Sequence, residues 1–257
     1  MSADATAHTP THLAVSQNAA LRRDRDADES KAVVAETVGS ACTPACTPMS
    51  RAVRIYGDLM RHVPWWALLS SGSAPVLLTG GWTVAERLQR HGYNPVTKTI
   101  SVLAAYGAPG YWAMTGILIA LGACYLITAV GLRVAAAAGR MALGGGGVFT
   151  IMLTLFPAPT RGGDFGHGTV VTVGFILMAF WPVLAAERNG PSAWALRPRV
   201  AVKASALMCV GAVWFLIELQ RNGAAGIAER VLTFAQALWP LVVVVSCVRH
   251  QVRHKSV

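Results

Sequence analysis

Long apolar blocks constrain the fold of this chain more than any other feature of its sequence. A helix needs about 20 mostly apolar residues to cross the hydrocarbon core of a bilayer. Six blocks meet or approach that length: residues 64–85, 111–132, 138–156, 168–186, 200–219 and 231–248. Charged residues make up only 13% of the chain, against about 25% in soluble domains. The sequence therefore predicts an all-α fold, a polytopic transmembrane helix bundle of about six spans.

The distribution of Lys and Arg predicts how these spans are oriented. The flanks on one side of the predicted membrane carry about twice as many Lys and Arg residues as the flanks on the other. Because the richer side is normally cytoplasmic, we expect a multi-pass protein of the bacterial plasma membrane with both termini in the cytoplasm. The net charge of +10 comes from these flanking bases. We therefore expect membrane lipids as partners, with membrane proteins or further copies of this chain as other candidates, and no nucleic acid.

The chain divides into three predicted regions. Residues 1–60 are polar and lack sustained periodicity, which predicts a disordered cytoplasmic tail. Residues 61–250 hold the six spans, and residues 251–257 form a short basic tail. Cys42 and Cys46 are separated by three residues with no second Cys/His pair after them, and no histidine lies deep in an apolar block. We therefore expect no metal and no cofactor.

Several different short motifs follow one another in a characteristic order along the apolar part of the chain. They are the Ser-rich first block ending in Gly80-Gly81, the run Thr99–Leu103 followed by Gly107–Gly110, the sequence Leu155-Phe156-Pro157, and Asp164 with Gly166-His167. This order resembles the bacterial integral membrane family called domain of unknown function 998, over about residues 64–250. The resemblance implies a six-helix membrane fold. It implies no activity, because the family is named for lacking an assigned one.

Asp164 and His167, with Arg161 beside them, form the most suggestive polar group, where a loop enters the fourth block. At i and i+3 on one helix face, the carboxylate could orient the imidazole for acid–base chemistry or ion binding. Alternatively, Asp164 caps the fourth helix by accepting hydrogen bonds from free backbone N–H groups, with His167 at the membrane interface. We favour the cap.

Ser70 and Ser73 in the first block and Glu218 in the fifth are the other candidates for a polar site. One of the serines could act as a nucleophile with His167 as its base, but small-residue helix packing is the favoured interpretation. Glu218 could serve a proton or cation path. We favour an ion pair with Arg221 instead. The run Gly144–Gly147 lacks the Lys and Ser/Thr of a phosphate loop, which indicates close helix packing.

Three functions stay open, and the sequence favours a non-enzymatic one. The first is a membrane component that binds lipid or a small molecule or assists envelope assembly, since the chain has few buried charges and no complete catalytic set. The second is a secondary transporter or channel, which requires its polar groups to converge on a path. The third is an intramembrane hydrolase that uses His167 with a first-span serine, which requires a hydroxyl within about 3 Å of the imidazole.

Overall fold

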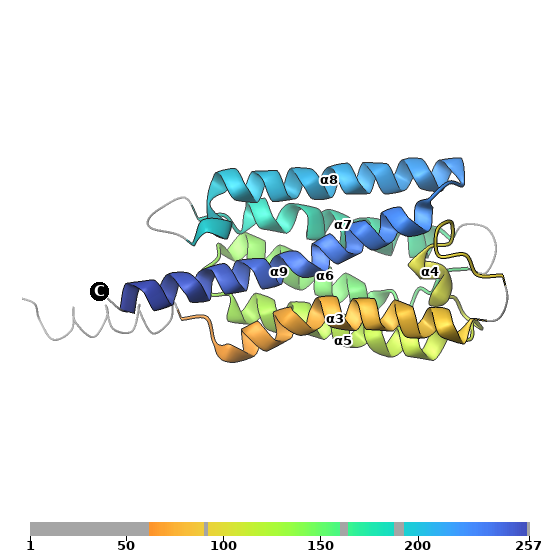
Figure 1. The fold of residues 1–257 in the computed structure, drawn as a ribbon, viewed down its shortest axis with the longest axis horizontal. Helices are drawn as coiled ribbons and strands as arrows, with labels where there is room; N and C mark the ends of the chain where they lie inside the picture. The colour runs from red at the N-terminus through yellow and green to blue at the C-terminus, as the bar shows by residue number, and fades with distance from the viewer. Residues whose placement is uncertain (1–61, 90–91, 160–163, 188–192, 256–257) are drawn as a thin grey trace, which may run out of the picture. The chain divides into compact units, whose positions relative to one another are not determined.

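The computed structural model describes residues 62–89, 92–159, 164–187 and 193–255. The predicted N-terminal tail and Arg161 lie outside the described residues. The described part of the chain is helical and contains no strand. Its helices (Figure 1) are α3 (Trp65–Leu88), α4 (Ile100–Leu103), α5 (Tyr111–Gly131), α6 (Ala137–Met152), α7 (Phe165–Leu184), the 3₁₀ helix η1 (Trp194–Leu196), α8 (Pro198–Arg221) and α9 (Ala225–Lys255).

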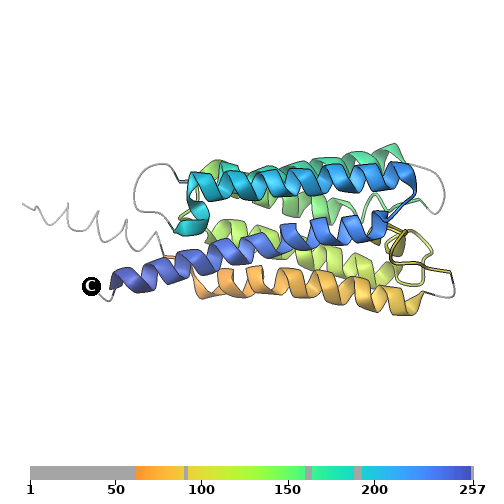
Figure 2. The same ribbon diagram turned by 45° about the horizontal axis from the view of Figure 1, so that its top comes forward.

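The six long helices form a closed ring. Each of them packs on the next long helix along the chain, and α9 closes the ring by packing on α3. They run side by side in both views, and the short α4 lies at the end where α3 finishes and α9 begins (Figures 1 and 2). The interior is filled by fully buried side chains of α6, α7 and α9, among them Leu143, Trp181, Val243 and Val244.

The outer surface and the composition of the helices identify a membrane protein. Among the described helices, α5, α7, α8 and α9 are long and apolar enough to cross a bilayer. The outward side chains of α8 at Leu207, Val210 and Val213 are each more than half exposed, as lipid-facing residues would be. Two predicted spans fall outside this group. The serines, threonines and glycines of α3 dilute its apolar content, and α6, with 16 residues, is only about 24 Å long.

The helix bounds follow the predicted blocks within a few residues, except that α9 extends beyond the sixth block at both ends, to Ala225 and to Lys255, and the earlier start affects the functional site. Helix α9 begins at Ala225, six residues before the sixth predicted block. Glu229 and Arg230, which the block boundary placed in a loop, therefore belong to the first turns of this helix. Between α3 and α5 the chain also forms the short helix α4.

The run Gly144–Gly147 packs closely against neighbouring helices, as predicted. A Cβ atom on Gly147 would lie 2.7 Å from the carbonyl oxygen of Gly122 in α5, and one on Gly146 would lie 2.6 Å from the sulfur of Met178 in α7. Because glycine has no side chain, α5, α6 and α7 approach one another more closely at these positions than a larger residue would allow.

Candidate functional site

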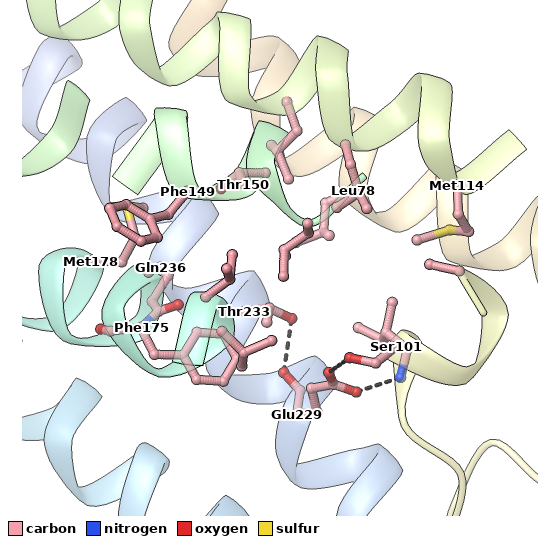
Figure 3. A pocket seen from close by; sticks show the side chains of 18 of the residues that line it. Leu78, Ser101, Met114, Phe149, Thr150, Phe175, Met178, Glu229, Thr233 and Gln236 are labelled. Atoms are coloured by element: carbon pink, nitrogen blue, oxygen red, sulfur yellow. Dashed lines mark hydrogen bonds between the residues drawn. The ribbon is translucent and has the colours of Figure 1, made fainter. Parts of the chain in front are cut away.

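A cavity lies inside the ring, near the end covered by α4. Its volume is about 100 Å³, and residues of α3, α4, α5, α6, α7 and α9 line it, whereas α8 contributes none. Most of the lining is apolar: Leu78, Met114, Phe149, Phe175 and Met178 are typical members (Figure 3). Of the lining residues that the structure describes, none is Lys or Arg. A concave, mostly apolar site with a few polar groups is the usual form of a small-molecule site.

The polar part of the lining comes mainly from one face of α9. Glu229, Thr233 and Gln236 stand at positions i, i+4 and i+7, so all three point from α9 toward the cavity. Glu229 and Gln236 are only 4% and 3% exposed. The Thr233 hydroxyl donates to the backbone carbonyl of Glu229 (2.8 Å), and the Gln236 amide donates to the carbonyl of Phe175 (3.4 Å). The side-chain carbonyl oxygen of Gln236 adds an acceptor to this face.

Glu229 carries the buried carboxylate of the site. One oxygen accepts a hydrogen bond from the backbone N–H of Ile100, and the other accepts from the hydroxyl of Ser101 (3.2 Å) (Figure 3). Both donors belong to the first turn of α4, so Glu229 caps this helix and fixes it over the end of the cavity. Within the described ranges, no basic side chain forms an ion pair with Glu229.

Arg230, the next residue, turns away from the cavity and fastens the segment that precedes α4. Its guanidinium pairs with Glu86 at the end of α3 and donates to the Tyr93 hydroxyl (2.6 Å). It also donates to the carbonyls of Pro95 (3.1 Å) and Lys98 (3.3 Å). Burial raises the pKa of Tyr93 above its usual value, although the hydrogen bond from Arg230 opposes this effect. Tyr93 is therefore a neutral phenol.

The chain approaches α9 closely at Gly226. Its backbone N–H donates to the carbonyl of Val96 (3.0 Å), and a Cβ atom there would collide with the carbonyl oxygens of Pro95 and Lys98. Gly226 and Arg230 together hold residues 93–99 against the first turns of α9.

The favoured interpretation of Asp164 is confirmed. Asp164 is the N-cap of α7, and its carboxylate accepts from the backbone N–H of His167 (3.0 Å). The imidazole Nδ1 of His167 is instead 2.7 Å from the carbonyl oxygen of Phe156. His167 lines the cavity, and it is the only one of the candidate residues predicted from the sequence that does so among those described.

The other predicted candidates lie elsewhere. Ser70 bonds with Thr128 across the α3–α5 contact (2.9 Å), and Ser73 is exposed on the outer side of α3. Both serines belong to the first half of α3, which starts at the end of the ring opposite to the start of α7 and its His167 (Figure 1). The predicted ion pair of Glu218 with Arg221 is wrong, because no salt bridge joins these two described residues, and Glu218 instead accepts from the backbone N–H of Ala224 (2.8 Å) ahead of α9.

Comparison with known proteins gives a family and no activity. The family model described as "Protein of unknown function (DUF998)" matches residues 73–246, which is more than half of the chain. The protein belongs to the DUF998 family. No curated protein and no solved structure matches it. The DUF998 match includes every residue that lines the cavity, from Leu78 to Gln236, so the cavity lies wholly within the family domain.

The sequence did not predict the residues that form most of the polar contacts in and beside the cavity, Glu229, Arg230 and Gln236. A signal for two of them was present. Glu229, Thr233 and Gln236 repeat at the spacing of one helix face, and they would have marked a polar stripe had the sixth helix been started earlier. The outward contacts of Arg230 had no such local signal, because its partners are distant in sequence.

Proposed function

We propose that this DUF998 protein binds a small, largely apolar molecule in the cavity between α3, α5, α6, α7 and α9. The observation that carries the proposal is the cavity itself, which joins an apolar lining to one polar edge formed by Glu229, Thr233 and Gln236. Close-packed interiors leave few voids larger than a water molecule. A partly open cavity of about 100 Å³ lined by five of the six ring helices is therefore better explained by a ligand than by packing.

We further propose that all six long helices cross the bacterial plasma membrane, with both termini in the cytoplasm. The Lys and Arg excess on the flanks supports this orientation, and the six helices run alongside one another in one ring (Figure 1). The short α6 begins near Arg140, whose side chain reaches back to the carbonyl of Ala129 (2.9 Å). A long basic side chain near the start of a helix can extend to the membrane interface. A helix shorter than the bilayer is thick can then still span the membrane. In this topology the cavity lies in the non-cytoplasmic half of the membrane.

The packed interior of the ring beyond the cavity favours a binding function over a transport function. Toward the opposite end of α7 and α9, the ring is filled by Trp181, Val243 and Val244, all of which are buried. A transporter needs a path to both sides of the membrane, whereas a binding protein needs one open or coverable end. Segment 93–104, with α4, is the part of the chain that covers this end.

Photolabelling in lipid nanodiscs tests the proposal. A hexanol that carries an aliphatic diazirine is the neutral probe, and mass spectrometry maps the labelled residues. We expect label on cavity residues of the wild type, displaced by an excess of unlabelled hexanol. The variant Gly174→Leu should reduce this label several-fold, since a Cβ there meets only Phe149 at 3.5 Å and the added atoms enter the cavity.

Gly116→Leu is the matched control. Gly116 lies in the first half of α5, and a Cβ atom added there would meet nothing within 4 Å, so the same atoms are added outside the cavity. We expect wild-type labelling from it. Cavity labelling that is absent in the wild type, or equal in the Gly174→Leu and Gly116→Leu variants, would contradict the proposed function.

A further inference from the structure

We infer that the ligand of this cavity is an amine with an apolar body, and that its protonated nitrogen pairs with the carboxylate of Glu229. This inference rests on the proposed function and names the chemical class of the ligand. It joins two observations, the buried carboxyl group of Glu229, which no described basic side chain pairs with, and the acceptor-rich edge of the cavity.

The first observation is the lack of a cation for Glu229 within the described part of the chain. A buried carboxylate is costly unless it is paired. The nearest base along the chain is Arg230, and its guanidinium is engaged outside the cavity by Glu86, Tyr93 and backbone carbonyls. The donors that reach Glu229 come from Ile100 and Ser101, and all of them are neutral.

The second observation is the balance of donors and acceptors along the polar edge. An ionised carboxylate offers about four acceptor positions, and the Ile100 N–H and the backbone and hydroxyl of Ser101 leave at least one of them for a further donor. The Thr233 hydroxyl and the Gln236 amide donate to backbone carbonyls, so the side-chain carbonyl of Gln236 is left as a further acceptor. The site therefore calls for a ligand that brings hydrogen-bond donors.

The charge of the lining excludes the opposite class of ligand. Among the described residues the cavity lining has no Lys or Arg, so a fatty acid would place its anion beside Glu229 without a counter-charge from them. A protonated amine supplies the missing charge and up to three N–H donors at once, and charge-assisted hydrogen bonds of this kind are the strongest available. The apolar residues around Phe149 and Met178 receive the rest of the molecule.

Two sources share this chemistry, a free alkylamine and the ethanolamine headgroup of a lipid. Nanodiscs of phosphatidylcholine alone and nanodiscs that include phosphatidylethanolamine distinguish them. If the ethanolamine lipid lowers amine labelling of the cavity, the headgroup is the occupant, and if labelling is unchanged, a free amine is. Either result supports the inference, provided that amine labelling exceeds alcohol labelling in phosphatidylcholine.

The deciding comparison uses diazirine-bearing hexylamine and hexanol on the same protein. Cavity labelling by each probe is divided by its labelling of the outward residues of α8, which corrects for the different concentrations of the two probes in the bilayer. We expect the amine to exceed the alcohol at cavity residues by about tenfold, the ratio that corresponds to about 1.4 kcal/mol. Equal labelling by the two probes would overturn the inference and leave the proposed function standing. Absence of cavity labelling by both would overturn both.

Glu229→Gln removes the charge and keeps the cap of α4. The amide oxygen can accept from the Ile100 N–H, and the amide nitrogen can donate to the Ser101 oxygen. We expect this variant to lose the amine preference and retain labelling by the alcohol. Glu218→Gln is the control, because Glu218 also accepts from a backbone N–H, that of Ala224, but does not line the cavity.

An amine preference that survives in the Glu229→Gln variant would assign the selectivity to other residues and overturn the inference. The amine and alcohol comparison in the wild type needs no variant, so it decides the question even if Glu229→Gln fails to fold.

Discussion

Replacing Gly147 with alanine should destabilise the protein, whereas the same change at Gly144, in the same glycine run, should not. A Cβ on Gly147 would lie 2.7 Å from the carbonyl oxygen of Gly122 and 3.1 Å from Cβ of Tyr125. Carbon and oxygen atoms normally approach to about 3.3–3.6 Å. Helices α5 and α6 would therefore have to move apart by several tenths of an ångström, and backbone atoms on α5 cannot rotate out of the way.

The two effects of the substitution have opposite signs. Overpacking of this kind costs about 1–3 kcal/mol, and replacing glycine inside a helix returns about 1 kcal/mol. At Gly144 the nearest atom to a new Cβ is Cβ of Ala129, at 3.7 Å, so only the favourable effect applies. We expect Gly144→Ala to be more stable than Gly147→Ala by about 2 kcal/mol.

Unfolding by sodium dodecyl sulfate, followed by tryptophan fluorescence in mixed micelles, measures this difference in the free energy of unfolding. Gly116→Ala, at a position with open space around it, serves as a second reference and should behave like Gly144→Ala. The reasoning fails if Gly147→Ala is as stable as Gly144→Ala, because the backbone contact between α5 and α6 would then be free to relax.

Three further predictions follow from side-chain contacts and use the same unfolding assay. Arg230→Ala should lower the free energy of unfolding by about 2–4 kcal/mol, because Glu86 and several carbonyls lose a charged donor; Arg230→Lys should not restore it, since a lysine lacks the planar fork that holds several acceptors at once. If Asp164 acts as a cap, Asp164→Ala should lower the free energy of unfolding by about 1 kcal/mol and Asp164→Asn should leave it nearly unchanged. An unequal effect of these two variants on amine labelling of the cavity would contradict the cap role. Ser70→Ala should cost about 1 kcal/mol through its bond to Thr128, while the exposed Ser73→Ala should stay within about 0.5 kcal/mol of the wild type.

The helices could be predicted from the sequence because their signal is local. Each apolar block fixes one helix, and Asp164 three residues before His167 fixes one cap. The start of α9 could not be found in this way. Hydropathy falls at Glu229 and Arg230, but the backbone hydrogen bonds of a helix do not depend on side-chain polarity. What makes these charges tolerable inside the helix is a set of partners, such as Ile100 and Glu86, that lie 129 to 144 residues away.

The error at Glu218 has a local cause of another kind. Spacing alone favoured the pair with Arg221, but α8 ends at Arg221, and the next residue, its C-cap Asn222, adopts a left-handed conformation with φ of 53°. That turn reverses the chain and brings the N–H of Ala224 to the Glu218 carboxylate. A fixed backbone donor then competes with a mobile, solvent-accessible arginine and wins, since an exposed ion pair contributes little.

The closed ring also bears on the order of events as the chain is made. Helices α5, α6, α7 and α8 each meet the long helix synthesised just before them, so four of the contacts between ring helices can form as the polypeptide emerges. The seam between α3 and α9 joins the first described helix to the last, so it cannot form until α9 has been synthesised. Until then the cavity has no wall on one side and Glu86 has no partner. A chain that stops before α9 would leave the inner face of α3 uncovered, the kind of surface that cellular quality control recognises.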